Sequence, residues 1–225
     1  MEKVKAVLHA HPYFYSPQKN GTPIDQRVYE FFSKPPRLWN IVKHAMKNGI
    51  GICAISACHS PTGGMDTRFE SYMKQLGKLG PQYEVDAHLN EGWVQIIAEK
   101  PLIILNSQEI RTDYKGKPAD INVIGVKRLI PHSLDIDETA RIGREEGGLV
   151  TICHGNSTRF SAGIDKTIEM VKTQKAHTAE GFNATEKPKV NKQLMQKLTQ
   201  EGIKWIAVPD SYHYKQNGAA GVIFP

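Results

Sequence analysis

Residues 4–11 read VKAVLHAH, an apolar and largely β-branched run that ends in two histidines. The run predicts a short buried strand over Val4–His9. Residues i and i+2 of a strand point to the same face, which places His9 and His11 together, roughly 6–7 Å apart along the strand. Two imidazoles on one face can chelate a cation. The alternative is an incidental pair of surface histidines.

Short apolar strands and helices alternate along the rest of the chain. Further strands are expected at 51–56, 102–110, 120–126, 149–153, 178–183, 203–208 and 219–224. Helices are expected from Pro36 to Gly49 and over 66–79, 82–99, 137–146, 161–175 and 188–200. Continuously apolar strands separated by helices favour a parallel sheet covered on both faces. The length and the lack of a Rossmann glycine pattern favour a slightly reduced α/β barrel, with 1–225 as a single domain.

Composition narrows the class of protein. Lys and Arg number 29 against 23 Asp and Glu, which gives a net charge of +6 and hints at an anionic partner. The composition excludes collagen-like, disordered and disulfide-scaffold proteins. Three cysteines without a CxxC pair favour a reducing cytoplasmic location. No apolar run reaches the ~20 residues of a membrane helix, and the start does not resemble a signal peptide.

Polar residues cluster just where several predicted strands end. They are Cys58-His59, Glu109, Cys153-His154, Asp210 and His213. Ligands of parallel α/β folds bind at the carboxyl ends of strands, and a mixed nitrogen and oxygen set favours Zn²⁺, Mn²⁺ or Fe²⁺. The alternatives are an exposed strand end for Glu109 and a hydrogen-bonded core histidine for His154. Cys53 and Cys153 are expected in the core, with Cys153 facing away from the ligand of His154.

The ordered motifs LHAH, AISACH, SQEIR, GGLVTICHGN and PDSYH resemble those of the PHP family, the polymerase-and-histidinol-phosphatase group of metal-dependent phosphoesterases. The resemblance runs from Val4 to about His213. It implies a distorted seven-stranded (β/α) barrel, of the TIM-like kind, with two or three divalent metal ions at its carboxyl rim.

The resemblance also implies ligands. His9, His11, Glu109 and Asp210 would hold the first metal, Glu109 would bridge to a second on His154, and His59 and His213 would approach a third. The second and last motifs depart from the family pattern, as do the positions of two further family histidines, so two metals are expected. Asp120 is a weaker oxygen ligand for the second site. Catalysis would fall to Glu109, Asp210 and Arg159.

The expected activity is hydrolysis of a phosphate ester by a hydroxide that bridges two cations. Arg111 and Arg159 would bind the phosphate, and Asn183 is a further polar candidate; solvated surface arginines are the alternative. The substrate is a phosphorylated small molecule or a nucleic acid. Lysines are frequent in the last third of the chain, which favours a nucleic acid; solvated helix faces are the alternative explanation for them. Two rivals remain: a degenerate, non-catalytic barrel that binds nucleic acid or serves as an assembly subunit, and hydrolysis of a C–N bond.

Overall fold

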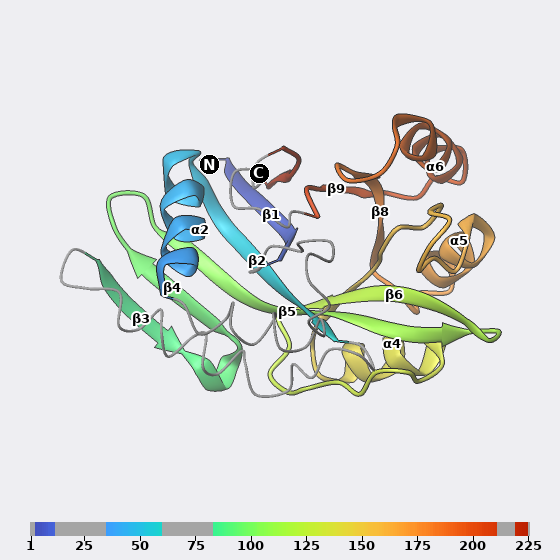
Figure 1. Cartoon of the computed structure of the whole chain (residues 1–225), viewed down its shortest axis with the longest axis horizontal. Helices are drawn as coiled ribbons and strands as arrows, with labels where there is room; N and C mark the ends of the chain where they lie inside the picture. The colour runs from blue at the N-terminus through green and yellow to red at the C-terminus, as the bar shows by residue number, and fades with distance from the viewer. Residues whose placement is uncertain (1–2, 12–34, 60–82, 211–218, 225) are drawn as a thin grey trace, which may run out of the picture.

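The computed structural model describes residues 3–11, 35–59, 83–210 and 219–224 (Figure 1). The strands are β1 (Val4–Ala10), β2 (Ile50–His59), β3 (Glu84–His88), β4 (Trp93–Ile97), β5 (Leu102–Tyr114), β6 (Lys117–Ile124), β7 (Leu149–Ile152), β8 (Thr178–Asn183), β9 (Ile206–Val208) and β10 (Val222–Phe224). The helices are α2 (Pro35–Lys47), α4 (Ile136–Glu145), α5 (Ile164–Lys172) and α6 (Pro188–Gln200), with one 3-10 turn, η1 (Leu89–Glu91).

The sheet follows the order β10-β1-β2-β5-β6-β7-β8-β9, and the β3–β4 hairpin adds to β5. The pairs β1–β2, β2–β5, β7–β8 and β8–β9 are parallel. β6 is antiparallel to both β5 and β7, so β7 runs in the same direction as β5. Six strands, β1, β2, β5, β7, β8 and β9, therefore point their carboxyl ends to one side of the sheet, which we call the rim.

The antiparallel β6 is a departure from the expected parallel arrangement. β5 and β6 form a hairpin whose turn residues, Lys115 and Gly116, have φ of 55° and 74°. Two successive positive φ values suit the tight turns whose twist matches that of a hairpin. Because β6 runs back from this turn, its first residues lie on the rim side and its last residues lie away from it.

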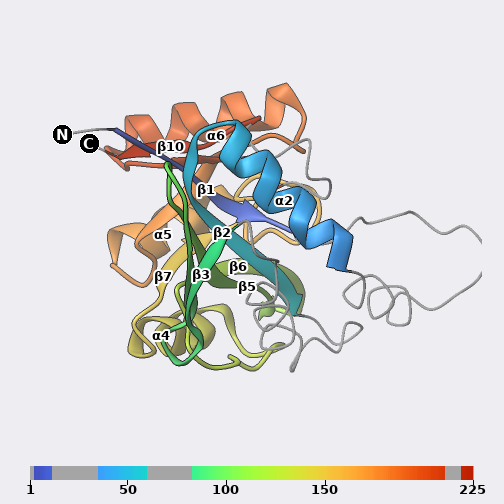
Figure 2. The same ribbon diagram turned by 90° about the vertical axis from the view of Figure 1, so that its left-hand side faces the viewer.

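The sheet curls into a nearly closed barrel, since β9 at one end of the strand order approaches β1 and β10 near the other (Figure 1). One core cluster joins α2 to β1, β2, β4 and β5, and a second joins α4, α5 and α6 to β5, β6, β7 and β8. Figure 2 shows α2 and α6 on the outside of the sheet. The predicted α/β barrel in a single domain is confirmed, with eight strands along the path in place of seven.

The helix expected over 82–99 is wrong, because this segment forms β3, η1 and β4. Val94 and Ile96 are fully buried, whereas Trp93, Gln95 and Ile97 are at least partly exposed. That alternation of period two is the pattern of a half-buried strand. The helix expected over 66–79 lies outside the described residues.

The helix expected over 161–175 is shorter at both ends, since α5 spans Ile164–Lys172. α5 begins at Ile164 after Gly163, and the Ser161 hydroxyl accepts a hydrogen bond from the Gly163 amide before the helix starts. α6 has the predicted bounds, Pro188–Gln200. Among the described residues, no helix combines the length and the apolar character needed to cross a membrane.

Candidate metal centre

His9 and His11 converge at the end of β1, and both side chains are buried. Their Nε2 atoms lie 3.2 Å apart. Nδ1 of His9 lies 2.6 Å from Oε1 of Glu180, and Nδ1 of His11 lies 2.9 Å from the carbonyl oxygen of Ser56. A ring nitrogen that donates to an oxygen leaves the opposite nitrogen to act as a ligand. Both Nε2 atoms are therefore aimed at one point.

Glu109 enters this cluster from β5. Its Oε2 lies 3.4 Å from Nε2 of His11, and its Oε1 lies 3.7 Å from Nε2 of His9. The same Oε1 lies 3.0 Å from Nε2 of His154, on β7's side of the cluster. One buried carboxylate therefore faces two imidazoles on one side and a third on the other, which suits a bridging ligand.

His154 and Asp210 complete the cluster from the ends of β7 and β9, and both adopt left-handed backbone conformations, with φ of 49° and 44°. Such values are uncommon for residues other than glycine and concentrate at functional sites. Oδ1 of Asp210 lies 3.1 Å from Nε2 of His11. Its Oδ2 accepts hydrogen bonds of 3.0 Å from both Asn183 and Thr185, which fix the carboxylate.

Glu180 on β8 is the residue of this centre that the sequence pattern does not reveal. It is only 1% exposed. Besides its contact with His9, its Oε2 accepts from the backbone amide of His154 at 3.3 Å and from Asn183 at 3.1 Å. The signal that was available is a lone acidic residue between Ala179 and Gly181 in a predicted strand, where an unpartnered carboxylate would be costly to bury.

The histidines and carboxylates of the cluster shift one another's pKa values in the direction that favours positive charge on the imidazoles and negative charge on the carboxylates. Burial lowers the pKa of His9, but the carboxylates of Glu180, Asp210 and Glu109 outweigh this effect and raise it to about 9. Burial likewise lowers the pKa of His154, and the same carboxylates, led by the hydrogen bond with Glu109, hold it well above its ordinary value. Burial raises the pKa of Glu109 and Asp210, yet the imidazoles hold both well below their usual range. The raised pKa values favour protons on His9 and His154, which a bound cation would displace.

Three groups of side chains bring ligand atoms within 4.8 Å of one another. They are His9, His11 and Glu109; Glu109, Asp120 and His154; and His9, Cys153 and Glu180. The first two groups share Glu109, and Asp210 adjoins the first through His11. Imidazole nitrogen and carboxylate oxygen are ligands for divalent transition metals, so these residues fit two such cations.

Asp120 reaches the centre from the first half of β6, where the reversed strand places it on the rim side. The guanidinium of Arg111 holds it through two hydrogen bonds, from Nε to Oδ1 and from Nη2 to Oδ2, the latter of 3.1 Å. Burial and the nearby charge of Glu109 raise the pKa of Asp120 to about 7 against the opposing effect of Arg111. The guanidinium carbon of Arg111 also lies 3.6 Å from the ring centroid of Phe160. Arg111 was predicted to bind the phosphate; in the structure its guanidinium instead contacts the carboxylate of Asp120 and the ring of Phe160.

The other residues predicted to belong to the site do not supply ligand atoms to the cluster in the part of the chain that the structure describes. Arg159 is exposed on the loop that follows β7, near His154 in the sequence. His59 ends β2 beside Ile110 of β5, but its side chain lies outside the described residues, as does the whole of His213. The third metal position therefore stays a prediction. Asn183 contributes to the centre through its hydrogen bonds rather than as a ligand.

Cys153 departs from its expected orientation. It is buried, as is Cys53, and burial raises the pKa of both thiols, that of Cys53 to about 12. The sulfur of Cys153 forms one of the three ligand groups together with atoms of His9 and Glu180. β7 ends at Ile152 and His154 is left-handed, so the strand alternation fails at this point. Cys153 and His154 consequently approach the same cluster.

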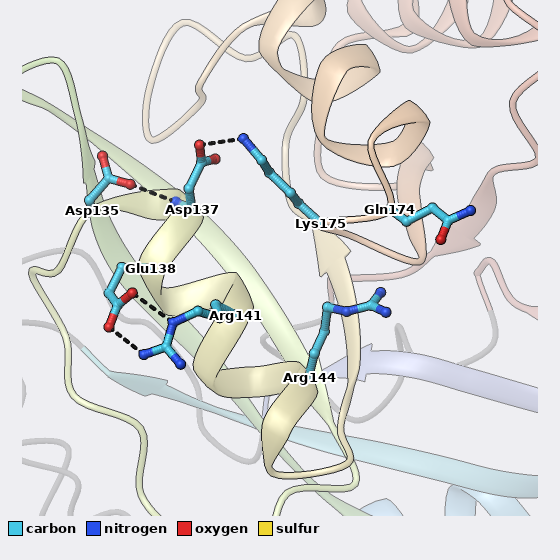
Figure 3. A pocket seen from close by; sticks show the side chains of 7 residues that line it. All are labelled: Asp135, Asp137, Glu138, Arg141, Arg144, Gln174 and Lys175. Carbon is cyan, nitrogen blue, oxygen red and sulfur yellow. Dashed lines mark hydrogen bonds and ion pairs between the residues drawn. The ribbon is translucent and has the colours of Figure 1, made fainter.

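A cavity of about 520 Å³ lies elsewhere, between α4 and the end of α5 (Figure 3). It is lined by Asp135, Asp137, Glu138, Arg141, Arg144, Gln174 and Lys175. Its charges are largely paired with one another, as in the contacts of Arg141 with Glu138 and of Lys175 with Asp137. None of these residues belongs to the metal-ligand groups, so the candidate centre is the histidine and carboxylate cluster.

A scan against protein-family models and a search of curated proteins give no match to this sequence. Solved structures do share its fold. PsfC from Pseudomonas syringae PB-5123 aligns with a TM-score of 0.64 at 10% identity, over 100% of this chain and 82% of PsfC. The lesion-specific endonuclease PfuEndoQ from Pyrococcus furiosus aligns with a TM-score of 0.54 at 13% identity, over 96% of this chain and 51% of the endonuclease. A candidate metal-dependent phosphoesterase from Bifidobacterium adolescentis aligns with a TM-score of 0.53 at 9% identity, over 93% of this chain and 88% of its own. At these identities the likeness establishes the barrel fold that all four chains share.

Proposed function

We propose that this protein is a metal-dependent hydrolase of phosphate esters, of the PHP type, that works with two divalent cations. The observation that carries the proposal is the sharing of Glu109 by two adjacent groups of buried ligand atoms. The fold likeness to a candidate phosphoesterase and to an endonuclease supports the same class of reaction. Zn²⁺, Mn²⁺ and Fe²⁺ are the cations that suit the nitrogen and oxygen ligands.

His9, His11 and Asp210 would hold one cation and His154 and Asp120 the other, with Glu109 between them. When bound, such a pair of cations lowers the pKa of water and neutralises charge on phosphoryl oxygens. The proposed site is therefore equipped to generate a nucleophile at neutral pH and to stabilise the attacked phosphate.

Side chains and one backbone carbonyl of the chain orient these ligands. Glu180 and the Ser56 carbonyl accept from the Nδ1 atoms of His9 and His11, which turns both Nε2 lone pairs into the centre. Asn183 and Thr185 fix one oxygen of Asp210 and leave the other facing His11. With ligands held before a cation arrives, little reorganisation is needed at the moment of reaction.

Arg159 is the residue we propose for contact with the phosphate. Its side chain is exposed on the loop after His154, whereas Arg111 is engaged with Asp120. A guanidinium can bind two phosphate oxygens at once. Arg159→Lys would keep the charge and lose this paired contact, so a larger effect on KM than on metal content is expected.

The test is elemental analysis of the purified protein, followed by assays on an aryl phosphate and an aryl phosphodiester with Mn²⁺, Zn²⁺ or Fe²⁺. We expect about two equivalents of metal and metal-dependent hydrolysis. Asp210→Asn and Glu109→Gln should each lower kcat/KM by more than roughly 100-fold, because ligands matter at least as much as the residues that orient them. Glu138→Gln, on the surface of α4, is the control and should leave both properties unchanged.

Less than one equivalent of metal, with no activity under any of the three cations, would overturn the proposal. That result would favour the non-catalytic barrel instead. Full metal content with hydrolysis of amides in place of phosphate esters would favour C–N bond hydrolysis. The two readouts together separate the three classes of function.

A further inference from the structure

Phe160 occupies an unusual position beside the candidate metal centre. Its side chain is 38% exposed although it is large and apolar, and its φ is 56°. A bulky residue in the left-handed region is a genuine outlier, and its strain persists only where the surroundings enforce it. An exposed aromatic side chain on a strained backbone calls for an explanation other than core packing.

Two contacts hold Phe160 in place. Its carbonyl oxygen accepts a hydrogen bond of 2.9 Å from the backbone amide of Asp120, the residue of the second ligand group on β6. Its ring packs against the guanidinium of Arg111, whose carbon lies 3.6 Å from the ring centroid. Arg111 in turn donates to the carboxylate of Asp120. One salt bridge and one stacking contact therefore connect the ring to the metal-ligand group.

Phe160 is not a member of the core clusters. The cluster around α4, α5 and α6 includes the partly buried Tyr114 and Ala162 at its edge, but not Phe160. The guanidinium of Arg111 lies over one face of the ring, and Phe160 still keeps 38% of its surface exposed. A flat apolar surface backed by a cation is the kind of platform on which nucleic-acid bases stack.

We propose that Phe160 is the stacking surface for the base of a nucleotide whose phosphate is bound at the metal centre. This inference rests on the proposed function and deepens it by naming the class of substrate, a phosphate ester that carries a nucleobase. Arg111 supports the ring from beneath, and Arg159, next to Phe160 in the chain, is exposed on the same loop to meet the phosphate. Arg111 is a positioning residue in this arrangement.

The test compares two probes that differ only in the base. The phosphonate analogues of adenosine monophosphate and of ribose 5-phosphate resist hydrolysis, so calorimetry on the metal-loaded protein gives a Kd for each. We expect the adenosine probe to bind roughly 5- to 150-fold more tightly, the range that stacking of one base contributes. Phe160→Leu should remove most of this preference, whereas Phe160→Trp should retain it.

Phe224→Leu is the matched control, because Phe224 is 40% exposed and lies on β10, which pairs with the start of β1. It should keep the wild-type preference. Equal affinity of the wild type for both probes, or binding of neither, would overturn the inference, as would a preference that survives in Phe160→Leu. Failure of the proposed function looks different, since it appears as absent metal or absent hydrolysis. Loss of the base preference in a protein that still binds metal and cleaves an aryl phosphate contradicts the stacking role alone.

Discussion

Glu180 holds His9 across the barrel: its Oε1 lies 2.6 Å from Nδ1 of the imidazole, although 171 residues separate the two in the chain. Both side chains are fully buried. The contact fixes which nitrogen of His9 faces the centre, and it joins β1, one strand from one end of the strand order, to β8, one strand from the other end. The nearly closed barrel is what makes this pairing possible.

Glu180→Gln should weaken metal binding by roughly 10- to 100-fold, the usual effect of losing a partner that orients a ligating histidine. The amide keeps the size of the side chain but loses the charge that favours the Nδ1 proton of His9. The measurement is a competition titration of the metal-loaded protein with a chelator. An unchanged metal affinity would show that Glu180 has no part in orienting His9, and Glu138→Gln on α4 serves as the surface control.

Cys153→Ala should leave the metal stoichiometry unchanged. The thiol shares a ligand group with His9 and Glu180, but Nδ1 of His9 is already bound to Glu180, and burial with the surrounding carboxylates holds the thiol pKa well above its ordinary value. A thiolate ligand needs the opposite environment. Elemental analysis of the variant checks this, and loss of one equivalent of metal would make Cys153 a ligand after all.

The convergence of His9, His11, Glu109, His154 and Asp210 on one rim follows from strand polarity, which an apolar run ending in a polar residue makes readable in a sequence. Glu180 was missed because a single acidic residue within a strand does not indicate which distant side chain will meet it. The approach of Asp120 depends on β6 running backwards. The Lys115-Gly116 turn was the available sign of that reversal, since glycine suits a positive φ.

The β3–β4 hairpin was missed for a related reason. A helix is expected over 82–99, whereas the burial of Val94 and Ile96, on β4 beside β5, shows a period of two. Short apolar runs fit both periods, and the partner strand decides between them. The site of Phe160 could not be foreseen either, because its contacts with Arg111 and Asp120 join residues far apart in the chain.

Gly92→Ala should destabilise the protein more than Gly116→Ala does. Both glycines have positive φ, of 78° and 74°, so the two substitutions carry a similar conformational cost. A Cβ on Gly92 would lie 2.6 Å from the carbonyl oxygen of Val126, whereas nothing lies within 4 Å of one on Gly116. We expect a further loss of about 1–3 kcal/mol for Gly92→Ala, the usual cost of forcing extra volume into a packed site. Urea unfolding of the two variants gives the comparison, and equal losses would contradict the steric explanation.

Asp137→Asn should destabilise the protein at neutral pH and do so less in acid. Asp137 on α4 accepts ion pairs of 2.6 Å from Lys166 and 2.7 Å from Lys175, and Figure 3 shows the second of these. Burial raises the pKa of Asp137, but the two lysines outweigh it and hold the pKa below its ordinary value. A carboxyl whose pKa is lower in the folded state stabilises that state above the unfolded pKa of about 3.9, and this contribution is lost as the pH falls through the folded value. The stability difference between wild type and Asp137→Asn should therefore be constant from pH 7 to about pH 5 and shrink below about pH 4.

Burial of the Lys166 side chain makes the Asp137–Lys166 ion pair contribute more to stability than the exposed ion pairs on α4. The Lys166 side chain is 7% exposed, so removal of the Asp137 charge leaves its ammonium with Glu169 and the ring of Tyr114 as partners. Arg141 and Glu138 form an exposed pair on α4, and exposed pairs contribute little. Thermal unfolding of Asp137→Asn and Glu138→Gln at pH 7, 5 and 3 tests both statements, because acid effects common to all variants cancel in the differences. A deficit in Asp137→Asn that persists undiminished at pH 3 would show that the aspartate acts through packing and not through its charge.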